Sequence, residues 1–388
     1  MDGPFLPPRG RIGPGQAAFR RQEPGGVNGP GGGRWDPVPN PRAGSLAARA
    51  RVWGTLWRVK GRRSPDVLAE WEGPKIGVVG SGLVGSTFAY TVIIQRLARE
   101  VVLVDINRDK AEGDAMDIRH ALAFARPALV HAGTYDDLEG ADLVVLAAGA
   151  SQRPGETRLD LLKRNVEIFH QIVPEVARVA PRAILLVATN PVDILTLATQ
   201  RFSQFPSQRV LGSGTVLDTA RLRVRLGQIL HVDPRSIHAS IIGEHGDSEL
   251  AVWSRATVGG IPLDQLAEAG IPEARQLADA AFREALVNDV RRAAYEIIQR
   301  KGATYYAIAA ALARIVEAVV HDEGSVHTIS TLATGYPDAE DLCIGVPAIL
   351  DRGGVRRVVV LPLAPDEERA FRRSAQILRE AAAEVGLL

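Results

Sequence analysis

Three glycines and one acid in the first half of the chain have the spacing that nucleotide binding requires. Gly80, Gly82 and Gly85 form the pattern G-x-G-x-x-G, and Asp105 lies 20 residues after Gly85. Such glycines permit a tight turn and let a pyrophosphate approach the backbone at a helix N-terminus, whose free N–H groups attract phosphate. Asp105 can accept hydrogen bonds from ribose hydroxyls and would repel a 2′-phosphate. The spacing therefore predicts NAD, rather than NADP, as the cofactor.

The elements around these glycines strengthen that interpretation, because an isolated glycine pattern is often only a strand–helix turn. Ile76–Val79 is a short apolar run typical of a buried strand. Leu83–Leu97 then has apolar residues at helical spacing, and Val101–Val104 is a second apolar run that Asp105 closes. A strand, a glycine turn, a helix and a strand ending in an acid favour nucleotide binding over a plain turn.

A second group of residues suited to chemistry lies in the other half of the chain. His245 is within the segment GEHGDSE, directly after the apolar run Ile237–Gly243. Asp218 and Arg221 are three residues apart and so share a helix face. A lone histidine is more often structural, and such an ion pair is common on surfaces. The charged, glycine-flanked segment at a strand end nevertheless favours a functional histidine.

Two loops also follow predicted strands, at the sheet edge where parallel folds bind ligands. Gly149–Arg158 reads GASQRPGETR and follows the strand Asp142–Ala147. Thr189–Asp193 reads TNPVD, and a cis peptide at Asn190–Pro191 would fix Asn190 at that edge. Taken alone, a solvated loop and an ordinary turn explain these two segments equally well.

The order of predicted elements indicates an α/β fold in two domains. Strands alternate with helices over residues 75–212, which predicts a doubly wound (Rossmann) parallel sheet that binds NAD. Residues 213–388 follow a different pattern, which predicts an α+β catalytic and substrate domain with antiparallel strands. The predicted elements of this second block are Thr215–Leu230, Ile237–Gly243, Arg275–Lys301, Tyr305–Val320, Val326–Ala333, Cys343–Leu350, Val355–Leu361 and Pro365–Val385.

Composition excludes several classes of function. Residues 1–72 hold twelve Arg or Lys against six acids, so the remainder has about five excess negative charges, which argues against nucleic acid as a partner. The only cysteine is Cys343, so neither an internal disulfide nor a cysteine zinc site is expected, and no metal is predicted. No apolar run approaches the ~20 residues of a membrane span. These features predict a cytoplasmic protein that does not bind membranes.

The first 74 residues are expected to be a disordered or spurious extension. Residues 1–43 are rich in Gly, Pro and Arg and have almost no periodicity. The segment Ser45–Lys60 has the pattern of a short basic amphipathic helix. A transit or surface-binding segment, an interaction tail, and upstream sequence translated from a wrongly chosen start all fit this composition, and we favour the last.

Six ordered segments together resemble the L-lactate/malate dehydrogenase family, and within it the bacterial L-lactate dehydrogenases. They read GSGLVGST, AGASQRPGETRLDLLKRN, TNPVD, GSGTVLDTARLR, GEHGDSE and KGATYYAIA. The resemblance covers the chain from about Lys75 to the C-terminus. It implies reversible hydride transfer between NADH and a 2-keto acid, with pyruvate and L-lactate as the expected substrates.

The resemblance also implies roles for four charged residues. His245 gives a proton to the substrate carbonyl oxygen, and Asp218 is its carboxylate partner. Arg221 grips the substrate carboxylate in a bidentate way, and Arg158 polarises the carbonyl. Because Arg158 lies on a loop, it would reach the substrate only when that loop closes.

Other positions are assigned by the same resemblance to substrate or cofactor. Gln152, Asn190 and Thr304 are expected to contact the substrate. The expected cofactor-binding residues are Gly80, Gly82, Leu83, Val84, Gly85, Asp105, Gly149, Ala150, Asn165 and Asn190.

Gln152 decides between pyruvate and oxaloacetate as the expected substrate. Malate enzymes of the family have an arginine there to pair with a second carboxylate, whereas a neutral amide leaves that carboxylate without a partner. Arg153, one residue later, keeps malate or another L-2-hydroxy acid open as an alternative. A non-catalytic NAD-binding sensor is a further alternative, but it gives no reason for His245, Asp218 and Arg158 to occur together.

Two more residues suggest regulation. The bacterial lactate dehydrogenases that respond to fructose 1,6-bisphosphate resemble this chain at Arg223 and His238, and these enzymes are homotetramers. The pair, repeated across a two-fold axis, would repel until a bisphosphate neutralises it. The alternative is a local ion pair of Arg223 and a packed strand histidine.

Overall fold

The computed structural model describes residues 73–150, 155 and 157–388. Nearly all of the predicted N-terminal extension therefore lies outside the described residues, as do Gln152 and Arg153. Within the described ranges, none of the helices combines the length and apolar character needed to cross a membrane.

Six parallel strands form the sheet of the first half, in the order β6-β5-β4-β1-β2-β3. The strands are β1 (Lys75–Val79), β2 (Glu100–Val104), β3 (Leu129–Ala132), β4 (Leu143–Leu146), β5 (Ile184–Val187) and β6 (Val210–Gly212). Strands β2, β4 and β5 are apolar runs with hardly any polar residue, which suits strands that are covered on both faces. With β1 between β2 and β4, this is the predicted doubly wound order.

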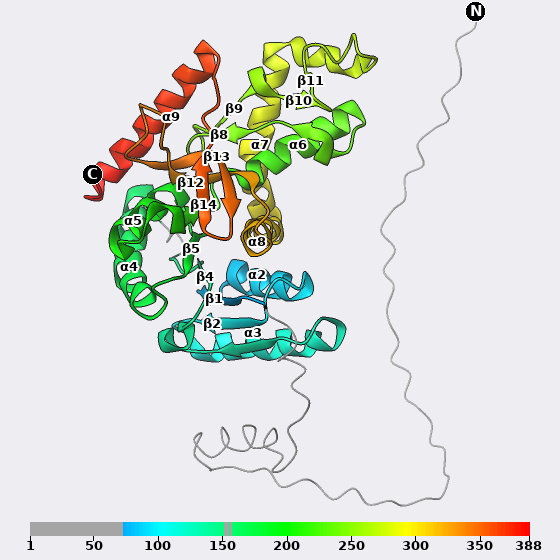
Figure 1. Ribbon diagram of the computed structural model, residues 1–388. Helices are drawn as coiled ribbons and strands as arrows, with labels where there is room; N and C mark the ends of the chain where they lie inside the picture. Colours follow the sequence, from blue (N-terminus) through cyan, green and yellow to red (C-terminus); the bar gives the residue numbers. More distant parts are fainter. Residues whose placement is uncertain (1–72, 151–154, 156) are drawn as a thin grey trace, which may run out of the picture. The chain divides into compact units, whose positions relative to one another are not determined.

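Helices cover both faces of the sheet (Figure 1). One apolar core, which includes Phe88 and Leu312, brings together α2 (Leu83–Ile94), α3 (Arg108–Ala121) and α8 (Tyr306–Val320). Another, which includes Phe169, Leu195 and Phe371, brings together α4 (Arg158–Val179), α5 (Val192–Ser203) and α9 (Pro365–Glu384). In Figure 1, α4 and α5 lie on one side of the strands and α2 with α8 on the other.

The sheet continues from the first half of the chain into the second. Strand β12 (Ser325–Leu332) pairs antiparallel with β6, with Ser330 opposite Gly212, and is followed in the sheet by β13 (Cys343–Asp351) and β14 (Gly354–Val358). Gly214 has a φ of +49°, and a Cβ there would lie 2.3 Å from the Ser330 backbone nitrogen. This close approach requires glycine.

A third apolar core lies in the second half, between α6 (Val216–Leu230) and α7 (Ala280–Lys301). Short strands complete this region, which Figure 1 shows beside α6 and α7. They are β7 (Ile237–His238), β8 (Ile241–Ile242), β9 (Leu250–Ala251), β10 (Thr257–Val258) and β11 (Ile261–Pro262). The strands β9, β10 and β11 were not predicted, because a run of two residues has no measurable periodicity.

Two of the predicted elements differ most from the structure in their extent. The predicted strand Ile237–Gly243 is two strands, β7 paired with β10 and β8 paired with β9. The break occurs because side chains of α6 bind the backbone there: Arg223 Nε donates to the Ala239 carbonyl (2.9 Å), and the Ile241 N–H donates to Thr219 Oγ1 (2.9 Å). The predicted helix Arg275–Lys301 begins only at Ala280, where Asp279 caps α7 by accepting from the Ala281 N–H.

Candidate active site

The glycine turn after β1 has the geometry that its sequence predicts. Gly80 has a φ of +102°, and its N–H donates to the Val104 carbonyl at 2.8 Å. A Cβ on Gly85 would lie 1.9 Å from the Gly80 carbonyl oxygen, so α2 can pack against the turn only with glycine there. A Cβ on Gly82 would meet no atom within 4 Å. Gly82 therefore presents open backbone, to which a ligand can approach.

The N-terminus of α2 is free to bind an anion. Gly82 is its N-cap, without a side-chain cap, and the first turn contains no acid. In that turn Leu83 is 55% exposed and Val84 is half-buried. Uncapped N–H groups and the positive end of the helix dipole are what a pyrophosphate needs. The residues present thus fit a dinucleotide at this turn.

Asp105 lies at the end of β2, beside the same turn. Its Oδ2 accepts from the Ser81 N–H at 2.6 Å, and its Oδ1 accepts from the Asn107 N–H at 2.8 Å. Asp114 of α3 accepts from the Ser81 hydroxyl and from Lys110, each at 2.6 Å. Ser81, Lys110 and Asp114 stabilise the turn but were not predicted to have a role. Only the position of Ser81 between two glycines could have suggested one.

Asn165 of α4 ties the next two loops together. Its buried Oδ1 accepts from the Ala150 N–H at 2.8 Å, and its Nδ2 donates to the Asn190 carbonyl at 3.1 Å. A Cβ on Gly149 would lie 2.4 Å from Thr189 Cγ2, so the loops after β4 and β5 are in close contact. The peptide bond from Asn190 to Pro191 is cis, as the sequence suggested. The structure thus brings four of the predicted cofactor-side residues to one edge of the sheet.

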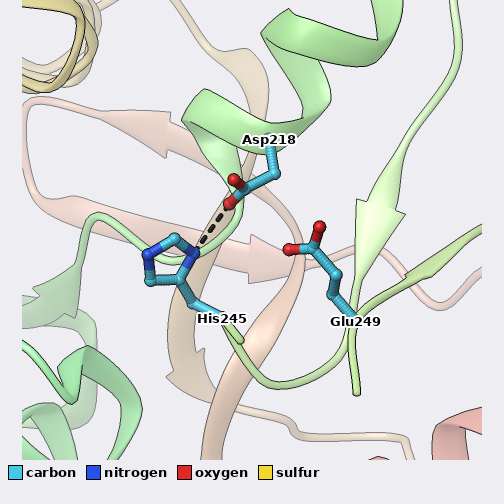
Figure 2. Close-up of side chains that lie close together, drawn as sticks. All are labelled: Asp218, His245 and Glu249. Carbon is cyan, nitrogen blue, oxygen red and sulfur yellow. Dashed lines mark hydrogen bonds and ion pairs between the residues drawn. The ribbon is translucent and has the colours of Figure 1, made fainter. Parts of the chain in front are cut away.

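Three charged residues meet in the second half of the molecule. Asp218 lies on α6 and His245 in the segment between β8 and β9, and Figure 2 shows the hydrogen bond between them. His245 Nδ1 lies 2.7 Å from Asp218 Oδ2, and Arg221 Nη1 donates to Asp218 Oδ1 at 2.8 Å. The Asp218 side chain is 3% exposed, against 25% for His245 and 16% for Arg221. One buried carboxylate therefore holds an imidazole and a guanidinium at the edge of solvent.

These contacts set the charges of the pair. Burial by itself would lower the pKa of His245, but the Asp218 carboxylate, with weaker help from Asp193 and Glu249, raises that pKa to about 9. Burial likewise opposes ionisation of Asp218, but His245 and then Arg221 hold its pKa below the usual range. At neutral pH the pair is an imidazolium on an aspartate.

Asp193, the last residue of TNPVD, binds the backbone of His245. Its Oδ2 accepts from the His245 backbone N–H at 2.7 Å, and its side chain is almost fully buried. Burial raises the pKa of Asp193 to about 6, against the opposing effect of its hydrogen bonds. From the sequence, Asp193 was predicted only to be part of a turn. Its contact spans 52 positions of the chain, so no local pattern revealed it.

Arg158 was predicted to lie on a loop, but it is the first residue of α4, which Thr157 caps, and its side chain is exposed. Its Nη1 donates to Asp247 Oδ2 and its Nη2 to the Tyr295 hydroxyl, both at 3.2 Å. The side chain is 78% exposed, and the hydrogen bond to Asp247 is the main cause that raises its pKa. Its observed partners are thus Asp247 and Tyr295, neither of which the sequence analysis identified.

The remaining described residues that the sequence predicted for the substrate and effector sites lie outside the Asp218–His245–Arg221 cluster. Thr304 is half-buried in the connection between α7 and α8. Arg223 Nε donates to the carbonyl of Ala239, the residue next to the exposed His238. Burial lowers the pKa of Arg223. Gln152 lies outside the described residues.

The two halves of the chain match the two parts of one family of dehydrogenases. Residues 74–212 match the lactate/malate dehydrogenase NAD binding domain, and residues 215–386 match the lactate/malate dehydrogenase alpha/beta C-terminal domain. With a dinucleotide turn in one half and a buried aspartate–histidine pair in the other, the fold and site define an NAD-dependent oxidoreductase. The chain belongs to the lactate/malate dehydrogenase family.

Within this family, the chain is similar to proteins named L-lactate dehydrogenase. The chain is 48% identical over 313 residues to the L-lactate dehydrogenase of Thermoanaerobacter sp. (strain X514), covering 81% of this chain and 99% of that protein. It is 50% identical over 313 residues to the L-lactate dehydrogenase of Thermus aquaticus, covering 80% of this chain and 99% of that protein. The structure is similar to the minor L-lactate dehydrogenase of Enterococcus mundtii in a ligand-bound form, with a TM-score of 0.78, 43% identity, and coverage of 81% and 99%.

Proposed function

We propose that the protein interconverts pyruvate and L-lactate with NAD as cofactor. The observation that carries the proposal is the buried Asp218–His245 pair with Arg221 on the second oxygen of the same aspartate. The pair provides a proton donor and Arg221 a carboxylate ligand, which are the two groups that a 2-keto acid needs. The identity of 47–50% to proteins named L-lactate dehydrogenase supports the choice of substrate.

His245 is the proposed proton donor and acceptor. Since its pKa is about 9, it is protonated near pH 7 and can give a proton from Nε2 to the substrate carbonyl oxygen, while Nδ1 stays bound to Asp218. NADH, when bound at the glycine turn, supplies the hydride. In lactate oxidation the neutral imidazole takes the proton from the hydroxyl, so this direction is favoured at higher pH.

The two arginines have separate proposed roles. Arg221 uses one N–H on Asp218, and the guanidinium has further donors for a substrate carboxylate. Arg158 polarises the substrate carbonyl after it exchanges Asp247 and Tyr295 for the substrate. Both hydrogen bonds of Arg158 are at the surface, where ion pairs contribute little to stability, so breaking them costs little free energy.

Substrate choice is tested by comparing kcat/KM for pyruvate and oxaloacetate. We expect pyruvate to be preferred, because the Gln152 amide offers no charge to a second carboxylate. The Gln152→Arg variant should move the preference toward oxaloacetate, and Arg153→Gln is the matched control that should not. A wild-type preference for oxaloacetate would contradict the assignment and favour a malate dehydrogenase.

A non-catalytic NAD-binding protein is the competing function. It would need only the turn at Gly80–Gly85 and Asp105. The Asp218–His245 pair in the second half of the chain would then have no function. The absorbance of NADH, followed after pyruvate is added, separates the two. A folded protein that binds NADH and oxidises none of it with any 2-keto acid would support the sensor.

We propose further that the enzyme is a cytoplasmic homotetramer activated by fructose 1,6-bisphosphate through Arg223 and His238. Arg223 lines a cavity of about 290 Å³ with Arg235 and Arg314, which gives the region a basic character. Activation would follow if the bisphosphate bound better to the state that binds pyruvate better.

The test of regulation is a pyruvate saturation curve with and without fructose 1,6-bisphosphate, near pH 6 and near pH 8. We expect the effector to lower the KM for pyruvate at the lower pH. Activation that survives intact in Arg223→Gln would reject this site.

A further inference from the structure

Glu249 is a buried carboxyl group to which the proposed mechanism gives no role. It ends the segment GEHGDSE, directly before β9, and is 2% exposed. Its backbone carbonyl accepts from Arg291 Nη2 at 2.6 Å. Its side-chain Oε1 is buried and has no hydrogen-bond partner in the described part of the chain. An ionised carboxylate in that position would be strongly disfavoured.

Glu249 lies beside the catalytic pair (Figure 2). One of its carboxyl oxygens lies within 4.8 Å of both a ring nitrogen of His245 and a carboxyl oxygen of Asp218. Two carboxylates in one buried space repel each other, so one of them keeps its proton. Asp218 has His245 on one oxygen and Arg221 on the other, whereas Oε1 of Glu249 has no partner. Asp218 therefore keeps the negative charge and Glu249 the proton.

We propose that Glu249 is a positioning residue for the Asp218–His245 pair: a neutral acid beside the pair near pH 7, and in alkaline solution a second negative charge that holds the proton on His245. The proposal rests on the proposed function in one respect, since it assumes that the proton of His245 is the one transferred.

The surroundings of Glu249 agree with this geometry. Burial, and then the charge of Asp218, raise the pKa of Glu249 to about 9, against the attraction of His245, Arg291 and Arg221. These groups come from α6, from α7 and from its own segment. The pKa of His245 is also about 9, so the two groups titrate in the same range and each affects the other. When Glu249 loses its proton, the new charge favours the imidazolium, which extends pyruvate reduction to higher pH.

The test is the Glu249→Gln variant, which keeps the volume and removes the ionisation. Oxamate, a pyruvate isostere that cannot accept a hydride, is titrated into the enzyme–NADH complex from pH 6 to pH 11, and its affinity reports the protonated fraction of His245. We expect the alkaline midpoint to fall by about one pH unit, with a loss of affinity of about twofold or less at pH 7. Glu249→Leu should give the same shift if the amide disturbs the fold.

The matched control is Glu367→Gln. Glu367 is also buried, but it lies on α9 and accepts hydrogen bonds from the Ser254 N–H and hydroxyl, at 2.9 and 2.6 Å. Its replacement should lower thermal stability and leave the oxamate midpoint where it is. An unchanged midpoint in both Glu249 variants would reject the proposal, as would a tenfold loss of oxamate affinity at pH 7, because Glu249 would then be ionised there.

A second measurement separates this proposal from the proposed function. The rate at which diethyl pyrocarbonate acylates His245, followed by mass spectrometry at that residue, reports the same titration without any substrate. A wild-type enzyme that binds no oxamate would contradict the proposed substrate. The Glu249 proposal would still stand if the acylation midpoint fell in Glu249→Gln, and would fail if it did not move.

Discussion

The glycine turn after β1 and the Asp218–His245 pair are built by opposite means. The turn after β1 depends on side chains that are absent: a Cβ on Gly80 or Gly85 would lie within 2.4 Å of backbone atoms. The Asp218–His245 pair depends on side chains that are present and charged, with the buried Asp218 bound to both His245 and Arg221. Substitutions in the turn should therefore act on packing, and substitutions in the pair should act on protonation and rate.

The largest expected effect tests the catalytic side of this contrast. His245→Asn should lower kcat for pyruvate reduction by about a thousandfold, because the proposed proton donor is removed. NADH binding, measured by fluorescence titration, should be unchanged, since the glycine turn is intact. A variant with near-normal turnover would show that another group donates the proton.

The next effect concerns pH. Pyruvate reduction requires the imidazolium and should be lost as pH rises through about 9, where His245 titrates. Asp218→Asn removes the charge that holds this proton, so the loss should begin at lower pH, and kcat/KM near pH 7 should fall by about a hundredfold. A pH profile that keeps the wild-type midpoint would mean that Asp218 does not set the pKa of His245.

The glycine turn should respond in the opposite manner. Gly85→Ala places a methyl group 1.9 Å from the Gly80 carbonyl oxygen, so α2 must move, at a cost of about 2 kcal/mol in the free energy of unfolding. Urea unfolding measures this cost. Gly82→Ala is the matched control, because its Cβ meets nothing within 4 Å and should weaken NADH binding more than stability. Equal unfolding free energies for the two variants would refute the steric argument.

The smallest expected effect concerns the exposed Arg158. Asp247→Asn removes the charged partner of Arg158, but both side chains are more than 60% exposed. Such pairs contribute little, so kcat/KM should change by no more than about threefold. A change of tenfold or more would show that Asp247 has a larger role than holding Arg158.

Local parts of this molecule could be predicted from sequence and distant contacts could not. The glycine turn lies within one short segment, and its spacing alone predicted strand, turn and helix. His245 and the pair Asp218 and Arg221 were singled out by their own segments, but only the resemblance to a family implied that they act together, since His245 and Asp218 are 27 residues apart. Asp193, Asp247 and Tyr295 were missed because each acts through a partner at least 48 residues away.

Distant contacts also explain why the predicted strand Ile237–Gly243 is wrong. The apolar run Ile237–Gly243 favours one continuous strand, and its interruption comes from Arg223 and Thr219 on a helix that precedes it. Side chains that bind the backbone of a separate element leave no periodic signal in that element. Such breaks require the tertiary structure.

The antiparallel seam between β6 and β12 has a consequence for recombination between relatives. Ser330 faces Gly212 across the seam, and Gly214 has no room for a side chain beside Ser330. The junction near residue 213, which separates the two family domains in sequence, is thus not a free joint in space. A chimera that takes its two halves from different parents must inherit Gly212, Gly214 and Ser330 as a compatible set, and only crossover points outside residues 212–330 face no such constraint from this seam.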